Sequence, residues 1–418
     1  MDLINYSAAA GFAFILCTVL TYALRAPAIR IGLVDEPDTR KMHNGTIPLT
    51  GGIAMFLSFV CAILIFDFDI RMFAPFLTAT CLLLGIGLLD DVKEIRPIWR
   101  IVTQCLAVLI MCLWANVSLT NVGDILFFGA ITLGWLSIPF TVFAVVGAVN
   151  ATNMADGLDG LAGGLTLIAF ASLALLTWDA NRSMETQTIL VFVAIVLGFL
   201  IWNARLPWRK RAAAFMGDSG STFLGLAVAW FMVQLSQGPD RVIAPVTGLW
   251  LFAIPIMDTL SITIRRIKKR KSPFRPGRDH LHHILQDAGY SPEKTAMAIW
   301  TAAGVCALIG IGGHKAGIPD GVMFCSFLLL FFTYARQTAR STSLRRMPHS
   351  NQSTRERLLA HPEFLSVATP RSMAALSSNR GTRRTRFSRS TSRMRRGVRQ
   401  TRPAESKPSS PDYGQDLS

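Results

Sequence analysis

Residues 150–178 read NATNMADGLDGLAGGLTLIAFASLALLTW, a polar and glycine-rich segment followed by an apolar run from Leu161 to Trp178. An apolar run of about 18 residues has the length that an α-helix needs to cross the hydrocarbon core of a bilayer. The aspartates and asparagines before it are costly to place in hydrocarbon. This stretch therefore predicts a membrane-spanning helix that follows a polar loop.

The same alternation recurs along the 418 residues, of which 51% are hydrophobic, with a mean hydropathy of +0.40. This composition argues against a soluble globular protein and predicts an all-α, polytopic membrane protein. We expect 11 spans, at residues 7–26, 49–66, 72–89, 101–117, 125–149, 161–178, 188–202, 219–235, 242–264, 296–313 and 318–334.

Basic residues in the connections predict the orientation of these spans. The odd-numbered connections hold 20 Lys and Arg residues and the even-numbered ones hold 4. Because basic residues are retained on the cytoplasmic side, we expect the N-terminus outside and the C-terminus in the cytoplasm.

The chain is expected to divide into a transmembrane catalytic domain, residues 1–335, and a disordered, Ser/Arg-rich basic cytoplasmic tail, residues 336–418. The tail holds 18 basic and 5 acidic residues, which leaves a net charge of only +3 on the membrane body. The body therefore gives no reason to expect a nucleic-acid partner, and the tail is expected to lie near anionic membrane lipids.

Five polar segments interrupt the apolar chain, and the predicted topology places all of them on one face. They are DEPDTRKMHNG from residue 35, LDDVKEIRP from 89, NATNMADGLDG from 150, FMGDSGS from 215 and RRIKKRKSPFRPGRDHLHH from 265. Acids, glycines, arginines and histidines gathered on one face indicate that a reaction takes place there.

The acidic residues predict a cation site. Asp90 and Asp91 are adjacent, and two such carboxylates raise each other's pKa unless a cation or proton joins them; the alternative is a solvated helix end. If residues 156–160 continue into the sixth helix, Asp156 and Asp159 share one helix face. Their segment also brings Asn150 and Asn153 as oxygen donors for a hard cation or a ribose, whereas a simple helix-packing role leaves the carboxylates unexplained.

The fourth polar segment offers Asp218 between Gly217 and Ser219, either as a helix N-cap or as a ligand to metal or phosphate. Phe215 is either an interfacial anchor or a platform for a flat base.

In the fifth segment, Arg265 and Arg266 lie closest to the membrane, where a guanidinium group can hold a pyrophosphate with two hydrogen bonds. One of these arginines is the expected partner of Asp258 inside the ninth span. His280, His282 and His283 favour phosphate contacts and proton handling over a zinc site or a solvated loop.

Together these residues fit a magnesium-assisted phosphoryl transfer to a lipid substrate, since Mg²⁺ is typically held by one or two carboxylates and substrate phosphates. Two alternatives remain: a transporter or flippase of an anionic lipid or sugar phosphate, and a membrane phosphatase that uses the histidines.

The order LLDDVKE, NATNMADGLDG, FMGDSGS, PIMDTLSITIRR and GRDHLHH resembles the polyprenyl-phosphate N-acetylhexosamine-1-phosphate transferases. It is most similar to the bacterial branch that transfers N-acetylglucosamine 1-phosphate to undecaprenyl phosphate in O-antigen, lipopolysaccharide and other cell-wall and envelope polysaccharide pathways. HLHH differs from the three consecutive histidines of the phospho-N-acetylmuramoyl-pentapeptide branch, which is the alternative within the family. Glu94 stands where several members have aspartate.

The resemblance implies transfer of a sugar 1-phosphate from a UDP-sugar donor to undecaprenyl phosphate, with release of UMP, with Mg²⁺ as cofactor and Mn²⁺ as a substitute. A homodimer is compatible with the sequence. The implied roles are a metal site at Asp218 and Asn153, uracil stacking on Phe215, nucleoside recognition by Asp159, acceptor-phosphate contacts at Asp90 and Asp91, pyrophosphate binding by Arg265, and contacts of His280, His282 and His283 with the sugar or a phosphate. We expect direct in-line attack rather than an aspartyl-phosphate intermediate.

Overall fold

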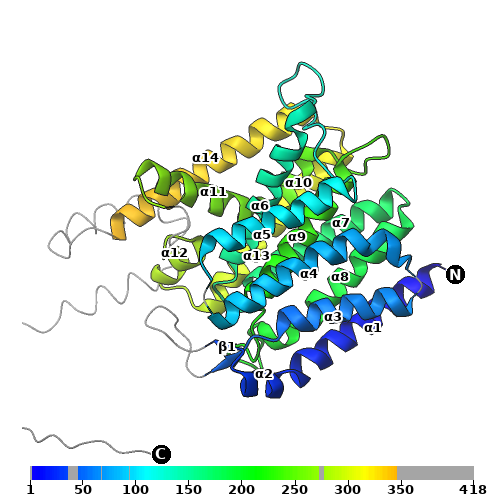
Figure 1. Cartoon of the computed structure of the whole chain (residues 1–418). Helices are drawn as coiled ribbons and strands as arrows, with labels where there is room; N and C mark the ends of the chain where they lie inside the picture. Colours follow the sequence, from blue (N-terminus) through cyan, green and yellow to red (C-terminus); the bar gives the residue numbers. More distant parts are fainter. Residues whose placement is uncertain (1, 36–45, 67, 94, 273–276, 346–418) are drawn as a thin grey trace, which may run out of the picture. The chain divides into compact units, whose positions relative to one another are not determined.

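The computed structural model describes residues 2–35, 46–66, 68–93, 95–272 and 277–345, and they are mostly helical (Figure 1). The helices are α1 (Asp2–Ala23), α2 (Arg25–Ile31), α3 (Gly51–Ile65), α4 (Ile70–Lys93), α5 (Pro97–Leu113), η1 (Gly134–Leu136), α6 (Ser137–Ala155), α7 (Leu161–Asp179), α8 (Ser183–Asn203), α9 (Gly217–Ser236), α10 (Pro245–Leu251), α11 (Ala253–Lys268), α12 (Leu281–Asp287), α13 (Pro292–Lys315) and α14 (Asp320–Arg345). Two short antiparallel strands, β1 (Val34–Asp35) and β2 (Ile47–Pro48), precede α3.

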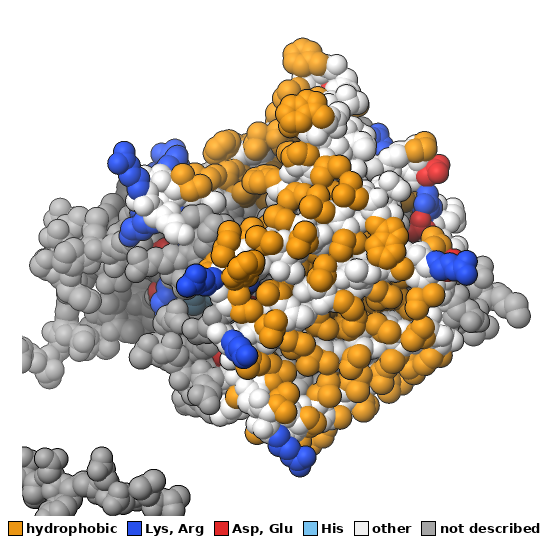
Figure 2. Space-filling view, viewed as in Figure 1, with side chains coloured by type: hydrophobic (Ala, Val, Ile, Leu, Met, Phe, Trp, Pro, Cys, Tyr) orange, Lys and Arg blue, Asp and Glu red, His pale blue; other side chains and the backbone are white. Residues whose placement is uncertain are grey.

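The chain is a multi-pass membrane protein. Within the described residues, 8 segments are long and apolar enough to cross a bilayer, and α10 with α11 form a further candidate that is bent by 86°. The apolar helices α3 and α5 are shorter. Figure 2 shows a surface of the kind expected for a membrane protein. Apolar side chains cover the face over α3, α4 and α5, and Lys and Arg side chains lie toward its edges.

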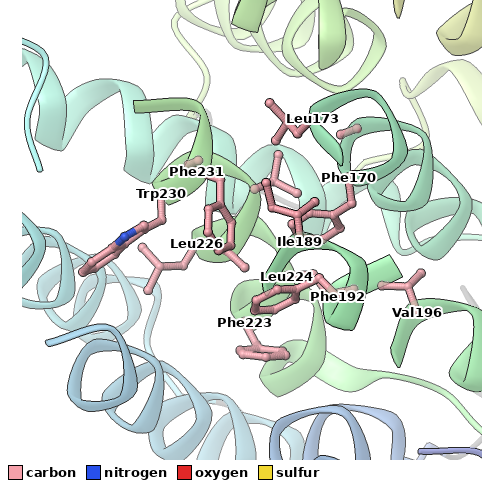
Figure 3. Packing of buried hydrophobic residues seen from close by; sticks show 14 of the residues in the cluster. Phe170, Leu173, Ile189, Phe192, Val196, Phe223, Leu224, Leu226, Trp230 and Phe231 are labelled. Atoms are coloured by element: carbon pink, nitrogen blue, oxygen red, sulfur yellow. The ribbon is translucent and has the colours of Figure 1, made fainter. Parts of the chain in front are cut away.

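Helix α9 lies at the centre of the packing, and 89% of its apolar stretch is buried inside the protein. It contacts α3, α4, α6 and α7. The core beside it is aromatic: the Phe192 ring lies 5.0 Å from that of Phe170 and 5.8 Å from that of Phe223 (Figure 3). This burial fixes the N-terminal end of α9, where Asp218 lies, against the surrounding helices.

The expected start of one span is wrong. The span expected at residues 125–149 begins at Ser137, because Gly123, Gly129 and Gly134 adopt positive φ angles in a non-helical segment before it. Residues 156–160 are not helical, and the sixth span begins at Leu161, as expected. At the other end of the chain, α14 continues past residue 335 to Arg345; the expected tail from residue 346 onward lies outside the described residues.

Candidate active site

A carboxylate from α4 caps the N-terminus of α9. Asp91 accepts a hydrogen bond from the backbone N–H of Asp218 at 2.8 Å through Oδ1. Its Oδ2 accepts from the Ser219 hydroxyl at 3.1 Å and from the Ser219 backbone N–H at 3.4 Å. The first N–H groups of a helix have no acceptor within the helix, and the helix dipole also favours a negative charge there. Asp91 therefore positions Asp218.

An arginine connects three of the expected site residues. The Nη1 atom of Arg100 lies 2.7 Å from Asp90 Oδ2 and 3.0 Å from Asp218 Oδ2, and its Nη2 donates to Asn153 Oδ1 at 3.1 Å. We call Asp90, Arg100, Asn153 and Asp218 the Arg100 cluster. Its members come from α4, α5, α6 and α9, so the cluster forms only when these four helices pack together.

Further hydrogen bonds orient the members of the Arg100 cluster. Asp90 Oδ1 accepts from the backbone N–H of Ile95 at 2.6 Å. The Asn153 amide Nδ2 donates to Asp218 Oδ1 and, at 2.9 Å, to the Ser221 hydroxyl. The Asp218 carboxylate is thus held by an amide on one oxygen and by a guanidinium group on the other.

Arg100 was not predicted as a site residue, because in the sequence it looked like one of the basic residues that set the orientation. A signal was present: Arg100 lies in the first turn of the apolar helix α5, which begins at Pro97. A charged side chain within a membrane helix usually faces the protein interior and has a partner.

Asp156 lies in the turn between α6 and α7, because α6 ends at Ala155 and Gly160 adopts a left-handed φ of 78° before α7 begins. Asp156 and Asp159 therefore do not share a helix face; the sequence predicted a shared face only if residues 156–160 continued into the sixth helix. The half-buried Asp156 carboxylate has no hydrogen-bond or ion-pair partner among the described residues. Burial, with the nearby charges of Asp218 and Asp91, raises its pKa well above the usual range. A cation next to this carboxylate would offset the nearby negative charges that raise its pKa.

Asp159 has fixed partners. Its Oδ2 accepts from Arg205 Nε at 2.8 Å and from the backbone N–H of Ala212 at 3.1 Å. Arg205 also bonds Glu293 Oε1 at 3.0 Å. Asp159 therefore links the turn before α7 to the segment before α9 and to α13. Arg205, like Arg100, was not singled out from the sequence.

The three histidines lie together beside the turn that contains Asp156. His280 and His282 are buried and His283 is half-buried, with the His282 ring 5.7 Å from His280 and 4.1 Å from His283. A Cβ atom at Gly157 would lie 2.6 Å from His282 Nε2, so this ring packs directly against the turn. Burial and the two neighbouring histidines lower the pKa of His282 to about 3, which keeps it neutral at ordinary pH.

The expected pairing of Asp258 with Arg265 or Arg266 is wrong. Asp258 Oδ2 lies 2.8 Å from His280 Nδ1, and Asp258 Oδ1 accepts from the Tyr334 hydroxyl at 2.7 Å and from the backbone N–H of Leu281 at 3.1 Å. The arginines were favoured because they are near in sequence. The chain instead folds the histidine segment back over α11, and α14 supplies the tyrosine.

Arg265 holds the histidine segment from the other side. It donates to the Asp279 carbonyl oxygen and to the Thr342 hydroxyl, each at 3.3 Å. Arg266 is buried, and its guanidinium group packs against Gly277. Both arginines thus lie next to the segment that leads into the histidines.

Two further expected residues lie at the margins of the site. Phe215 is half-buried and packs with Ile53 and Leu88 on a small apolar cluster, and its backbone N–H donates to the Pro48 carbonyl at 3.0 Å. The Asn150 amide donates to Gln104 Oε1 at 2.7 Å and so joins α6 to α5.

The Arg100 cluster offers donors that suit Mg²⁺. Among the described residues, no three His, Cys, Asp or Glu side chains gather closely enough to hold a metal ion by themselves. Mg²⁺, however, usually takes one or two carboxylates and completes its shell with water and substrate phosphates. Asp218 and Asn153 provide a carboxylate and an amide oxygen, and the Arg100 guanidinium shows that these oxygens converge on a positive charge.

Comparison with known proteins gives consistent matches. A family model described as Glycosyl transferase family 4 matches residues 73–236, which include Asp90, Arg100, Asn153 and Asp218. The chain is also similar to proteins named undecaprenyl-phosphate alpha-N-acetylglucosaminyl 1-phosphate transferase. It is 40% identical to that of Haemophilus influenzae over 312 residues, 74% of this chain and 88% of the relative. It is 38% identical to that of Pasteurella multocida over 323 residues, 77% and 90% of the two chains, and 35% identical to that of Escherichia coli K12 over 335 residues, 80% and 91%.

Proposed function

We propose that this chain, which belongs to the family of undecaprenyl-phosphate alpha-N-acetylglucosaminyl 1-phosphate transferases, transfers N-acetylglucosamine 1-phosphate from UDP-N-acetylglucosamine to undecaprenyl phosphate. UMP is the second product. The lipid-linked sugar is the first intermediate of an O-antigen or other envelope polysaccharide. The observation that carries this proposal is the Arg100 cluster, where two carboxylates, an amide and a guanidinium group meet at the end of four membrane helices.

The reaction forms one bond, between an oxygen of the acceptor phosphate and the β-phosphorus of the nucleotide sugar. It breaks the bond between that phosphorus and the oxygen that bridges to the α-phosphorus, and this oxygen leaves on UMP. A phosphomonoester has a second pKa of about 6, so the acceptor is mostly dianionic at pH 7 and needs little base catalysis.

Mg²⁺ would be held by Asp218 and Asn153, with Asp156 beside them, and would offset the negative charge of the two phosphate-bearing substrates. Arg100 binds the acceptor phosphate, because it is the cation already placed beside Asp90. Arg265 and Arg266 hold the pyrophosphate, and the histidines contact the sugar or a phosphate. Phe215 faces the uracil, and Asp159 positions the turn that recognises the nucleoside with Asn150 supporting it from α6.

The contacts of the two adjacent aspartates favour direct attack over a covalent intermediate. Both oxygens of Asp91 accept hydrogen bonds at the start of α9, and both oxygens of Asp90 have partners, Arg100 and Ile95. A nucleophilic carboxylate needs an oxygen free to attack. Detection of a phosphorylated aspartate in a rapidly quenched single turnover would overturn this assignment.

The proposed topology has eleven spans, with the N-terminus outside and the C-terminus and the active site on the cytoplasmic side of the inner membrane. The bent pair α10–α11 and the two shorter apolar helices α3 and α5, added to the long candidates, support this count. Single cysteines at Lys210 and at Phe128, both exposed, test it in a chain without its native cysteines. An impermeant maleimide should label the Phe128→Cys protein in intact spheroplasts and the Lys210→Cys protein only after permeabilisation.

The activity is tested with purified protein, undecaprenyl phosphate and UDP-N-acetylglucosamine labelled in the sugar. We expect label in the lipid phase and an equal amount of UMP, both lost with EDTA and restored by Mg²⁺ or Mn²⁺. UDP-N-acetylgalactosamine should transfer less label. Binding of UDP-sugar without release of UMP would support a transporter instead.

Asp218→Ala should abolish transfer while the protein remains in the membrane. The matched control is Asp179→Ala, which removes an aspartate from the far end of α7, where it pairs with Lys315. Full transfer by the Asp218 variant at ordinary Mg²⁺ would exclude Asp218 from the site.

A further inference from the structure

We propose that Asp258 and Tyr334 are positioning residues that fix His280 in one orientation and one tautomer, so that its Nε2 atom is presented to the substrate. The proposal rests on the proposed function, since it assigns a role within that same reaction. It is carried by the hydrogen bonds around Asp258, which lies on α11, apart from the aspartates of the Arg100 cluster.

The Asp258 carboxylate accepts hydrogen bonds from three donors. Tyr334 and the backbone N–H of Leu281 donate to Oδ1 at 2.7 and 3.1 Å, and Oδ2 lies 2.8 Å from His280 Nδ1. A tyrosine hydroxyl and a backbone amide that both donate to Oδ1 stabilise the ionised form of the carboxylate, which can only accept hydrogen bonds. With Asp258 ionised, His280 Nδ1 carries the proton of the contact with Oδ2.

A proton on Nδ1 determines what Nε2 can do. In a neutral imidazole Nε2 is then the acceptor, and in an imidazolium it is a donor. The His280 side chain has no other hydrogen-bond partner among the described residues, and it keeps 10% of its surface exposed. Its Nε2 atom is therefore left for a group that is not part of the protein.

The stacked ring of His282 completes the arrangement. It lies 5.7 Å from the His280 ring at an angle of 11°, and on its other side it packs against Gly157 in the turn that contains Asp156. His280 is thus connected to the acidic turn through one aromatic ring. Within the proposed reaction, the ligand of Nε2 is a phosphate oxygen or a sugar hydroxyl of the UDP-sugar.

The test is a double-mutant cycle on the labelled-sugar assay with the full-length protein. Asp258→Asn should lower kcat/KM about 10²-fold, the size typical of a misplaced acid–base or donor group, because an amide can donate to Nδ1 and so favours the wrong tautomer. Tyr334→Phe, which leaves the Asp258–His280 contact in place, should cost less. In a His280→Ala background, both substitutions should have no further effect, since these residues act through the histidine.

A purely structural role predicts a different result: the losses of Asp258→Asn and His280→Ala would multiply, and the melting temperature would fall in parallel. That result overturns the inference. Should Asp258→Asn fail to fold, the Tyr334→Phe cycle alone decides by the same criterion.

The matched control is Ser261→Ala. Ser261 and Thr338 form a hydrogen bond of 3.3 Å between the same two helices, α11 and α14, without touching the histidine. This variant should keep wild-type kcat/KM. If the wild-type protein transfers no label at all, the proposed function fails; an active wild type with multiplicative losses refutes only the positioning role.

Discussion

The side chain of Asp91 holds the backbone of Asp218: the Asp218 N–H donates to Asp91 Oδ1 at 2.8 Å. This relationship separates the two neighbouring aspartates of α4. Asp91 holds the start of α9, whereas Asp90 faces Arg100. The two residues, identical in type and adjacent in sequence, are therefore expected to respond differently to substitution.

Replacement of Asp91 should affect stability first. Asp91→Ala removes acceptors from the start of a helix, which typically costs about 1–2 kcal/mol, and it releases Asp218, so transfer should fall as well. Asp91→Asn keeps one acceptor oxygen and should give intermediate values of both. Thermal unfolding in detergent and label transfer measure the two effects. Equal melting temperatures for wild type and Asp91→Ala would contradict the capping role.

Replacement of Arg100 should affect activity more than folding. Arg100→Gln removes the charge that offsets Asp90 and Asp218, and kcat/KM should fall at least about 10²-fold, by analogy with the loss of one preorganised charged donor. Arg100→Lys keeps the charge but loses the planar geometry that reaches three partners. Its activity should therefore lie between those of the wild type and of Arg100→Gln. Saturation curves for both substrates measure this.

The control for these variants is Arg182→Gln. Arg182 pairs with Glu185 in the connection between α7 and α8, far in sequence from the Arg100 cluster, and its replacement should leave kcat/KM unchanged. An Arg100→Gln protein as active as this control would remove Arg100 from the site.

The Asp159–Arg205 pair should stabilise the segment that leads into α9. Arg205→Ala also leaves Glu293 without this partner, and because the pair is partly exposed we expect a loss of only about 1 kcal/mol of folding free energy. Cleavage by trypsin at Lys210 or Arg211 should become faster. Glu293→Gln, which changes only the second contact of Arg205, should have a milder effect. If Arg205→Ala is cleaved at the wild-type rate, the pair does not hold this segment.

His282 should make the folded state sensitive to acid. Its folded pKa of about 3 lies below the ordinary histidine value of 6.5, so the unfolded chain binds more protons between these two values. The stability is therefore complete above pH 6.5 and decreases as the pH falls toward 3, with a limiting slope of about 1.4 kcal/mol per pH unit. The melting temperature of His282→Phe, which cannot take up a proton, should fall less than that of the wild type between pH 7 and pH 5. Parallel curves would argue against a neutral, buried His282.

The sequence predicted the helical class because apolar runs of bilayer length are a strong local signal. The segment 125–136 shows where this signal fails. It is apolar enough to extend the following span, but its glycines adopt positive φ angles, and α6 begins only at Ser137. Apolar composition alone does not report whether the backbone is helical.

The site was predictable as a set of residue types and less so as a set of contacts. Asp218 and Asn153 do lie together, joined by a hydrogen bond. Arg100, which contacts both of them, was not predicted, and neither was Arg205, the partner of Asp159, because both looked like ordinary basic residues of a loop. The predicted partner of Asp258 was wrong for a related reason. Tyr334 is 76 residues away in the sequence, and no local sequence pattern indicates that α14 packs against α11.

The position of Arg100 has a consequence for how ligands enter. Its guanidinium carries one positive charge against the two negative charges of Asp90 and Asp218, so it offsets part of the repulsion between these carboxylates. Within the proposed function, a divalent ion held by Asp218 would compete with that internal counter-ion, and the released guanidinium would become available to the lipid phosphate. Ion and acceptor are thus expected to promote each other's binding, a thermodynamic coupling that arises from the exchange of one positive charge for another.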